Sequence, residues 1–227
     1  MKTVFRILLG VAICFLSYIC VMSVVTPIRF EEKRAERETA VVKNLIAIRT
    51  AQNEFKLQKG YFTADLDSLV LFLQTAKKKE VHKEGALTDK QLEAGMTEAK
   101  AVKIIQRGNQ KEIEKHGLQN FRRDTIYSNI IQSLYKGEYT EENIGEIIYI
   151  PYTDNIKYQV EVNNEYKTDK GIHVPLIEVC APYDTYLADL DKQELINLID
   201  KEKKLDHYPG LRFGSVDSPN NNAGNWE

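Results

Sequence analysis

The pattern of apolar and polar residues begins with an uncharged run at residues 7–25, which Lys2 and Arg6 precede. At about 1.5 Å per residue, a helix over this run would reach about 28 Å, close to the thickness of a bilayer's hydrocarbon core. The run ends in CVMSVVTP, which is a poor cleavage site, and neither of its two cysteines follows the small residues that a lipoprotein requires. The pattern therefore predicts an uncleaved signal anchor over residues 7–26.

The charges on the two sides of this run do not settle its orientation. Two cations precede it, and the four cations that follow it are interleaved with four carboxylates. A short tail before a first apolar segment usually remains inside, so residues 1–6 are expected to form a cytoplasmic tail. We therefore expect a single-pass protein of a bacterial inner membrane with its head in the periplasm.

Residues 27–59 are predicted to form a helical stalk, because no Gly or Pro occurs between Ile28 and Gln58. Its first half is charged, with Arg34 and Glu38 as an opposite pair one turn apart. That half has little to bury and is expected to project the head from the bilayer. The second half carries an apolar stripe at spacings of three and four, formed by Val41, Leu45, Ile48, Ala51 and Phe55. The stripe can pack on the chain's own head or on a helix of another chain.

Residues 60–227 are predicted to form an α+β head. Runs of β-branched and aromatic residues, one of them strictly alternating, predict strands at residues 124–135, 147–152, 156–162 and 172–180. The last two would pair as a hairpin in an antiparallel sheet of about four strands, which the stalk helix would cover. Short amphipathic stretches predict helices at residues 64–77 and 189–204.

The segment at residues 75–123 is highly charged and is interpreted as an insertion on the head. Within it, Thr88 and Thr97 stand where each can cap a short helix. The three lysines at residues 77–79 are interpreted as a solvated helix end, where cations suit the helix dipole. A basic site for anionic partners is the alternative.

Composition narrows the class of protein. The chain is 43% hydrophobic and 28% charged, as in a globular protein, and its net charge of −2 gives no field that would attract nucleic acid. Cys14 and Cys20 lie inside the apolar run, and Cys180 is the remaining cysteine. In the context LIEVC we interpret Cys180 as a small buried hydrophobe, with pairing between molecules as the alternative.

No pattern in the sequence indicates catalysis. The four His are scattered, and neither a His-x-x-His nor a Cys-x-x-Cys spacing occurs, so we expect no zinc site, no other cofactor and no enzyme. A weak calcium candidate lies in the polar C-terminal segment, where Asp217, Asn220 and Asn222 offer hard oxygen ligands. Turn formation explains the same residues. Trp226, in the same segment, either folds back on the sheet or is offered to a partner.

The first third of the chain carries a series of residues that points to a known family: Arg49, Ala51, Gln52, Phe55, Gly60, Tyr61, Phe62, Asp65, Leu66 and Leu69. Through this series, and the apolar helix before it, residues 1–73 resemble type IV pilins and type II secretion pseudopilins. The resemblance implies that the first helix is half membrane anchor and half spine of a globular α+β head. It also adds to the calcium candidate, because some pseudopilins hold Ca²⁺ in a C-terminal loop.

The chain departs from that family at the prepilin cleavage site. Gly10 is followed by Val11, and Phe15 stands at the position where the family has a Glu. The resemblance therefore predicts a pilin-like fold more strongly than a filament.

Together these observations predict a membrane-anchored structural or assembly protein of the envelope without catalysis. Its partners would be the lipid bilayer and other envelope proteins or a second copy, and not nucleic acid. The contacts are expected at the anchor and at Val41, Leu45, Ile48, Phe55 and Trp226. The alternative is a membrane-tethered ligand-binding or sensory domain.

Overall fold

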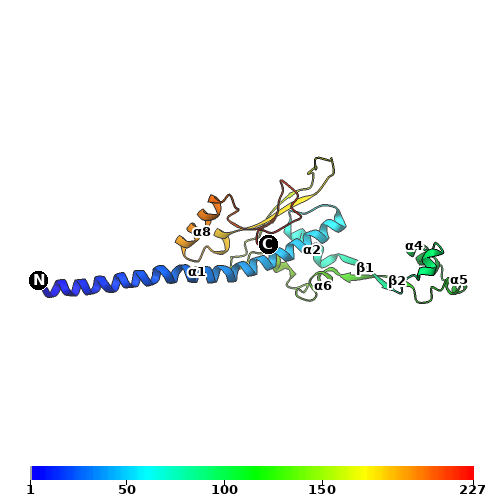
Figure 1. Cartoon of the computed structure of the whole chain (residues 1–227), viewed down its shortest axis with the longest axis horizontal. Coiled ribbons are helices and arrows are strands. Elements are labelled where there is room, and N and C mark those ends of the chain that lie inside the picture. The colour runs from blue at the N-terminus through cyan, green and yellow to red at the C-terminus, as the bar shows by residue number, and fades with distance from the viewer. Residues whose placement is uncertain (1) are drawn as a thin grey trace. The chain divides into compact units, whose positions relative to one another are not determined.

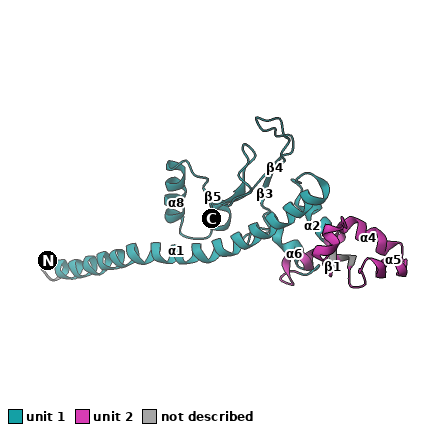
Figure 2. Cartoon of the chain, turned by 45° about the vertical axis from the view of Figure 1, so that its right-hand side comes forward, with its two compact units in different colours: residues 1–73, 140–227 teal, residues 74–139 magenta. Residues whose placement is uncertain are grey.

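The computed structural model describes residues 2–227, and within that range it leaves the side chains of residues 2–3, 79–83 and 122–127 undescribed. The chain divides into two compact units, which Figure 2 colours separately. Unit 1 comprises residues 1–73 and 140–227, and unit 2 comprises residues 74–139. Helices and antiparallel strands occur in both units, so the predicted α+β class is confirmed.

One helix, α1 (Lys2–Lys59), runs through the whole first part of unit 1 and continues through Pro27. Its most apolar window has a mean hydropathy of 2.5, and none of that window is buried. In Figure 1 this part of α1 extends alone beyond the other elements of unit 1. The helix is therefore long and apolar enough to span a membrane, as a transmembrane helix or signal anchor does.

The second half of α1 is the spine of unit 1. Val41, Leu45, Ile48 and Ala51 are fully buried, and Phe55 is nearly so. Their spacing places them on one face of the helix, which packs against η1 (Ile144–Ile148) and β5 (Gly210–Gly214). The stripe therefore covers the chain's own head, which was one of its two predicted roles.

The charged first half of the spine lies closer to the head than the sequence indicated. Phe30 is buried, and Arg37 donates hydrogen bonds to the backbone oxygen of Tyr186 and to the carboxylate of Asp189. The head therefore begins at Phe30, and the expectation that this half has little to bury is wrong. Its projection of the head from a bilayer stays a prediction. The predicted pair is confirmed, with Arg34 Nε 2.8 Å from Glu38 Oε1.

The turn after α1 follows the predicted chemistry. Gly60 has φ of +89°, and its N–H donates to the Lys56 oxygen at 2.8 Å, which ends the helix in the left-handed conformation. Helix α2 (Leu66–Thr75) then begins after Asp65, whose carboxylate accepts from the Asp67 N–H at 3.1 Å. The helix predicted at residues 64–77 is confirmed with shorter ends.

The sheet of unit 1 has three antiparallel strands in the order β3-β4-β5, and β4 is central. β3 (Gln159–Asn163) pairs with β4 (Leu176–Pro182), so that Val160 faces Val179, as the predicted hairpin requires. β4 also pairs with β5, which the sequence did not predict. The β4 backbone is thus paired along both edges, and its apolar side chains are buried on both faces of the sheet.

The strand predicted at residues 147–152 is wrong. The segment enters the 3₁₀ helix η1 instead, and only an isolated bridge from Tyr149 to Lys157 remains of the strand. Ile144, Ile147 and Ile148 are all buried. Their spacing of three and four places them on one helical face, which packs against α1.

Two helices complete unit 1, α7 (Tyr183–Tyr186) and α8 (Lys192–Lys204). The helix predicted at residues 189–204 begins at Lys192 because Asp191 is its N-cap. The Asp191 carboxylate accepts from the backbone N–H groups of Gln193 and Glu194, both at 3.0 Å.

Unit 2 contains a two-stranded antiparallel ribbon formed by β1 (Lys77–Glu84) and β2 (Arg122–Asn129). The lysines at 77–79 therefore lie in a strand, and their interpretation as a helix end is wrong. The strand predicted at residues 124–135 is correct only as far as Asn129. There the Asn129 side chain accepts from the Ile131 N–H at 2.8 Å and starts α6 (Ile130–Tyr135).

Along the sequence, three short helices connect the two strands of the ribbon, namely α3 (Asp89–Glu93), α4 (Glu98–Gln106) and α5 (Gln110–Lys115). They enclose a small core of Ala101, Leu118 and Phe121. Thr88 and Thr97 are the N-caps of α3 and α4, as predicted. The predicted charged insertion at residues 75–123 falls inside this unit. The described residues thus form sheets of two and three strands, and one sheet of four is not confirmed.

Candidate functional site

A polar groove of about 560 Å³ opens in unit 1 between α1 and the segments that follow β4. Its walls come from four parts of the chain. The ionisable and aromatic side chains that line it are Arg34, Glu38, Tyr183, Glu202, Asp206, His207, Tyr208, Arg212 and Trp226. This groove is the candidate site, because it gathers aromatic and ionic groups that lie far apart in the sequence.

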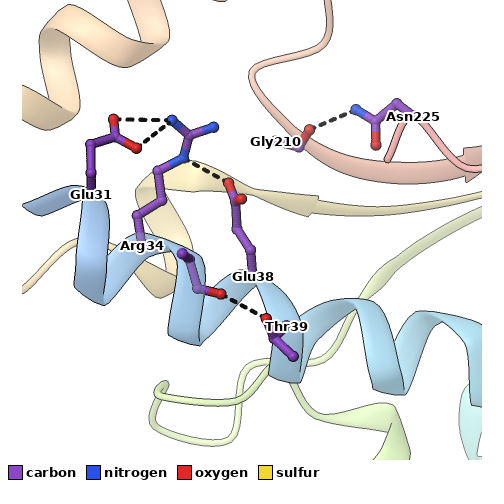
Figure 3. A network of polar contacts seen from close by, with 7 residues as sticks. Glu31, Arg34, Glu38, Thr39, Gly210 and Asn225 are labelled. Carbon is purple, nitrogen blue, oxygen red and sulfur yellow. Dashed lines mark hydrogen bonds and ion pairs between the residues drawn. The ribbon is translucent and has the colours of Figure 1, made fainter. Parts of the chain in front are cut away.

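Arg34 forms the α1 side of the groove. Its guanidinium lies between two carboxylates, 2.8 Å from Glu38 and 3.2 Å from Glu31, as Figure 3 shows. The same group lies over the ring of Tyr183 at 5.4 Å from the centroid. Burial alone would lower the pKa of Arg34, but the hydrogen bond from Arg34 to Glu38 and the charge of Glu38 outweigh burial and raise it. Arg34 is therefore a permanent cation with a fixed position.

The opposite wall is built on β4 and β5. Arg212 donates to Glu178 at 3.3 Å, and its guanidinium lies over the Tyr208 ring at 5.4 Å. Burial raises the pKa of Tyr208, and the neighbouring Cys180 thiol adds to the effect. This wall therefore presents the neutral Tyr208 phenol and the Arg212 cation, whose charge is compensated by Glu178.

The C-terminal segment closes the groove by folding back on the sheet and on α1. The Asn225 amide donates to the Gly210 oxygen at 2.9 Å, as Figure 3 shows, and its Oδ1 accepts from the Arg212 N–H at 3.0 Å. Arg49 of α1 bonds Glu227 at 2.6 Å and lies 5.9 Å from the Trp226 ring centroid. Trp226 therefore lies in the fold and borders the groove.

The predicted contact residues lie elsewhere. Val41, Leu45, Ile48 and Phe55 are brought together, but on the buried face of α1 and outside the groove. They would reach a partner only if the head opened. Of the predicted contact set, Trp226 is the member that the structure places at the groove.

The three calcium candidates take part in turns. The Asn220 side-chain oxygen accepts from the Asn222 N–H at 3.1 Å, and the Asn222 amide donates to Asn53 on α1 at 3.0 Å. The Asp217 N–H donates to the Ser215 hydroxyl at 3.2 Å. Across the described residues, no group of three or more His, Cys, Asp and Glu side chains is arranged to hold a metal ion. The calcium site stays a prediction that these contacts do not support.

Sequence reasoning found one part of the groove and missed the rest. The Arg34–Glu38 pair is visible as a spacing of four in a helix. Tyr183, Tyr208 and Arg212 carry no such local signal, because they meet only when β5 pairs with β4. The alternation of Leu211 and Phe213 in YPGLRFGSV was the available signal for that strand.

The groove combines fixed charges with aromatic surfaces. Its cations are held by carboxylates, and three aromatic rings line it, so it offers flat apolar surfaces edged by fixed charges. Such surfaces bind a polar ligand with apolar faces through stacking and hydrogen bonds.

Cys180 is expected to resist alkylation in the folded protein. It is buried in β4, and burial raises the pKa of its thiol to about 12, with the charge of Glu178 adding to the shift. Because the thiolate is the reactive form, iodoacetamide at pH 8 should modify Cys180 only in denaturant. Mass spectrometry of peptides after labelling, with and without urea, measures this; rapid native labelling would contradict it.

Gly224→Ala should displace Trp226. A Cβ at Gly224 would lie 2.5 Å from the Trp226 ring, so the ring must leave its position beside Arg49. The lost stacking should cost about 1 kcal/mol of unfolding free energy and shift the Trp226 emission to longer wavelength. The chain has one Trp, so the emission reports this site alone. Ala223→Ser, at the exposed neighbouring residue, is the control and should leave the spectrum unchanged.

Comparisons with known proteins identify no relative of this chain. No protein-family model matches the chain, no curated protein matches it, and no solved structure matches it.

Proposed function

We propose that this chain is a membrane-anchored structural or assembly protein of a bacterial envelope, with a head resembling those of pilins and pseudopilins. The proposal rests on one observation, the continuity of α1. The first half of that helix is apolar and unburied, and the second half is the core of the head. A single rigid element therefore joins a segment fit for lipid to a folded domain.

The likeness to pilins is supported by what the motif residues do. Gln52 is fully buried, and its amide donates to the Thr63 oxygen at 2.7 Å and accepts from the Thr63 N–H at 3.3 Å. Phe55 packs edge-to-face on Tyr61 and on Phe72, with centroids 5.6 and 5.0 Å apart. These residues hold the chain folded back on the end of α1.

The proposed location follows from the tail before the anchor. Residues 1–6 would remain in the cytoplasm, the segment at 7–26 would cross the inner membrane, and the head would lie in the periplasm. Assembly would occur through the exposed face of the anchor, where Phe15 replaces the Glu of pilins. Lateral packing of apolar helices in lipid requires no such charge. We therefore propose a complex in the plane of the membrane rather than a filament.

Site-specific cross-linking of the full chain in vesicles tests this function. A photoreactive residue in place of the exposed Leu16 should give cross-links to a second copy or to another envelope protein. The same residue at Ile172, which is exposed on the hairpin after β3, is the control and should give none. An anchored chain that gives no cross-link from several anchor positions would contradict the assembly role.

The groove favours a second candidate, a membrane-tethered ligand-binding domain. Its volume of about 560 Å³ is that of a small-molecule site, and Tyr183, Tyr208 and Trp226 line it. The test is thermal unfolding of the full chain in detergent with candidate oligosaccharides and short peptides, followed by Trp226 emission. A concentration-dependent rise in Tm that Tyr208→Ala abolishes would support this candidate over the first.

A further inference from the structure

A second hollow, of about 400 Å³, lies where the head meets the end of the apolar run of α1. From α1 it is lined by Met22, Thr26, Arg29, Phe30 and Lys33, and from the head by residues 189–191. Met22 and Thr26 are partly covered, although most of the apolar run is exposed. The head therefore reaches down to the last turns of the run and encloses a space there.

The depth of this pocket follows from the helix rise. If the hydrocarbon core ends near Val25, Arg29 lies about 6 Å and Lys33 about 12 Å beyond it. The headgroup layer on each side of a bilayer is about 5 to 8 Å thick. Arg29 is thus at the level of the phosphates, and the flexible Lys33 side chain reaches the same level from above.

The carboxylates of the pocket have hydrogen-bonding partners within the protein, whereas its cations remain available. Asp189 is held by Arg37, with Nη2 2.8 Å from Oδ2, and Asp191 caps α8. The hydrogen bond from Arg37 lowers the pKa of Asp189, and the charge of Lys33 adds to this effect. Arg29 and Lys33 are exposed, and neither forms a hydrogen bond or ion pair with the side chains that the structure describes. The pocket thus offers two cations whose charge is available to a ligand.

We propose that this pocket holds the phosphodiester group of a membrane phospholipid. Arg29 and Lys33, one turn apart on the same face of α1, bind the phosphate oxygens. Met22 and Leu190 lie against the first part of an acyl chain. Only a ligand that joins a phosphate to an apolar chain matches both walls, and a free phosphate leaves the apolar wall uncovered.

This inference rests on the proposed membrane anchoring and adds a lipid class to it. The head would be bound to the bilayer by a lipid as well as by α1. The contact also places the α7–α8 connection, which Arg37 fastens to α1, against the headgroup layer.

The test uses the full chain in detergent micelles and native mass spectrometry. Phosphatidylglycerol is added in increasing amounts, and the pocket variant carries both Arg29→Gln and Lys33→Gln. The control variant carries both Lys203→Gln and Lys204→Gln, which removes the same charge from the exposed end of α8. We expect one retained lipid in the wild type and the control, and about 30-fold weaker retention in the pocket variant.

Two further arms identify the source of the phosphate. A galactosyl diacylglycerol with the same acyl chains should not be retained. Inorganic phosphate at about 10 mM, which is enough to occupy a weak anion site, should not displace phosphatidylglycerol. Equal retention by the pocket variant, retention of the galactolipid, or displacement by inorganic phosphate would each overturn the inference.

Flotation of the same proteins with vesicles distinguishes a failure of the lipid site from a failure of the proposed membrane anchoring. If all variants float and lipid retention is insensitive to Arg29 and Lys33, the lipid site fails and the anchoring stands. If the wild type does not float, the anchoring fails and the lipid site fails with it.

Discussion

Ile48→Glu is expected to unfold the head. Ile48 is fully buried on the face of α1 that packs against η1 and β5. Removing a buried isoleucine side chain costs about 2 to 5 kcal/mol, and burying a carboxyl group without a partner costs several more. The sum, about 5 kcal/mol or more, is comparable with the whole stability of a domain. Urea unfolding of the full chain in detergent, followed by Trp226 emission, measures the change.

Ile46→Glu is the matched control, because Ile46 lies two residues away on the same helix and is 41% exposed. It adds the same charge to the same element and should cost less than about 1 kcal/mol. A stable Ile48→Glu protein would show that the stripe does not cover the head. It would return Val41, Leu45, Ile48 and Phe55 to the role of a free contact surface.

Gly214→Ala is expected to separate β5 from β4. Gly214 ends β5 with φ of +78°, and a Cβ there would lie 2.0 Å from the Ile177 oxygen. The left-handed backbone costs a residue with a Cβ about 1 to 2 kcal/mol, and the contact with the β4 backbone can be relieved only by moving a strand. We expect a loss of at least about 3 kcal/mol in the same urea experiment, with early exposure of Trp226.

Gly171→Ala isolates the part of this effect that comes from the close approach. Gly171 has a similar φ of +74°, but its Cβ would meet nothing within 4 Å. The control should therefore show only the backbone cost of about 1 to 2 kcal/mol. Equal losses in the two variants would mean that β5 tolerates the displacement and that its pairing contributes little.

Local signals in the sequence predicted the helical part of the fold well. Gly60 ends α1, Asp65 starts α2 and Thr97 caps α4, each through a hydrogen bond within a few residues. The periodic stripe on α1 was correct for the same reason, because a spacing of three and four fixes one helical face. The sequence left open only which surface covers that face.

Long-range pairing decided the elements that were missed. β1 and β5 are strands because a distant partner supplies their hydrogen bonds, and neither carries a long β-branched run. Residues 147–152 have strand propensity, yet packing against α1 selects a 3₁₀ turn. The groove was beyond prediction for the same reason, since Arg34, Tyr183 and Arg212 meet only after the sheet forms.

The start of the head at Phe30 has an electrostatic consequence. Phe30 lies five residue steps after Val25 along a continuous helix, which is a rise of about 7.5 Å. In the proposed membrane-anchored state, that rise is close to the Debye length of about 8 Å at physiological ionic strength, so salt screens the base of the head from the bilayer only in part. In that state, the charges around Asp189 and Asp191 experience the surface potential of the membrane. A change in the proportion of anionic lipid would then alter the local concentration of cations at this face without any change in the protein.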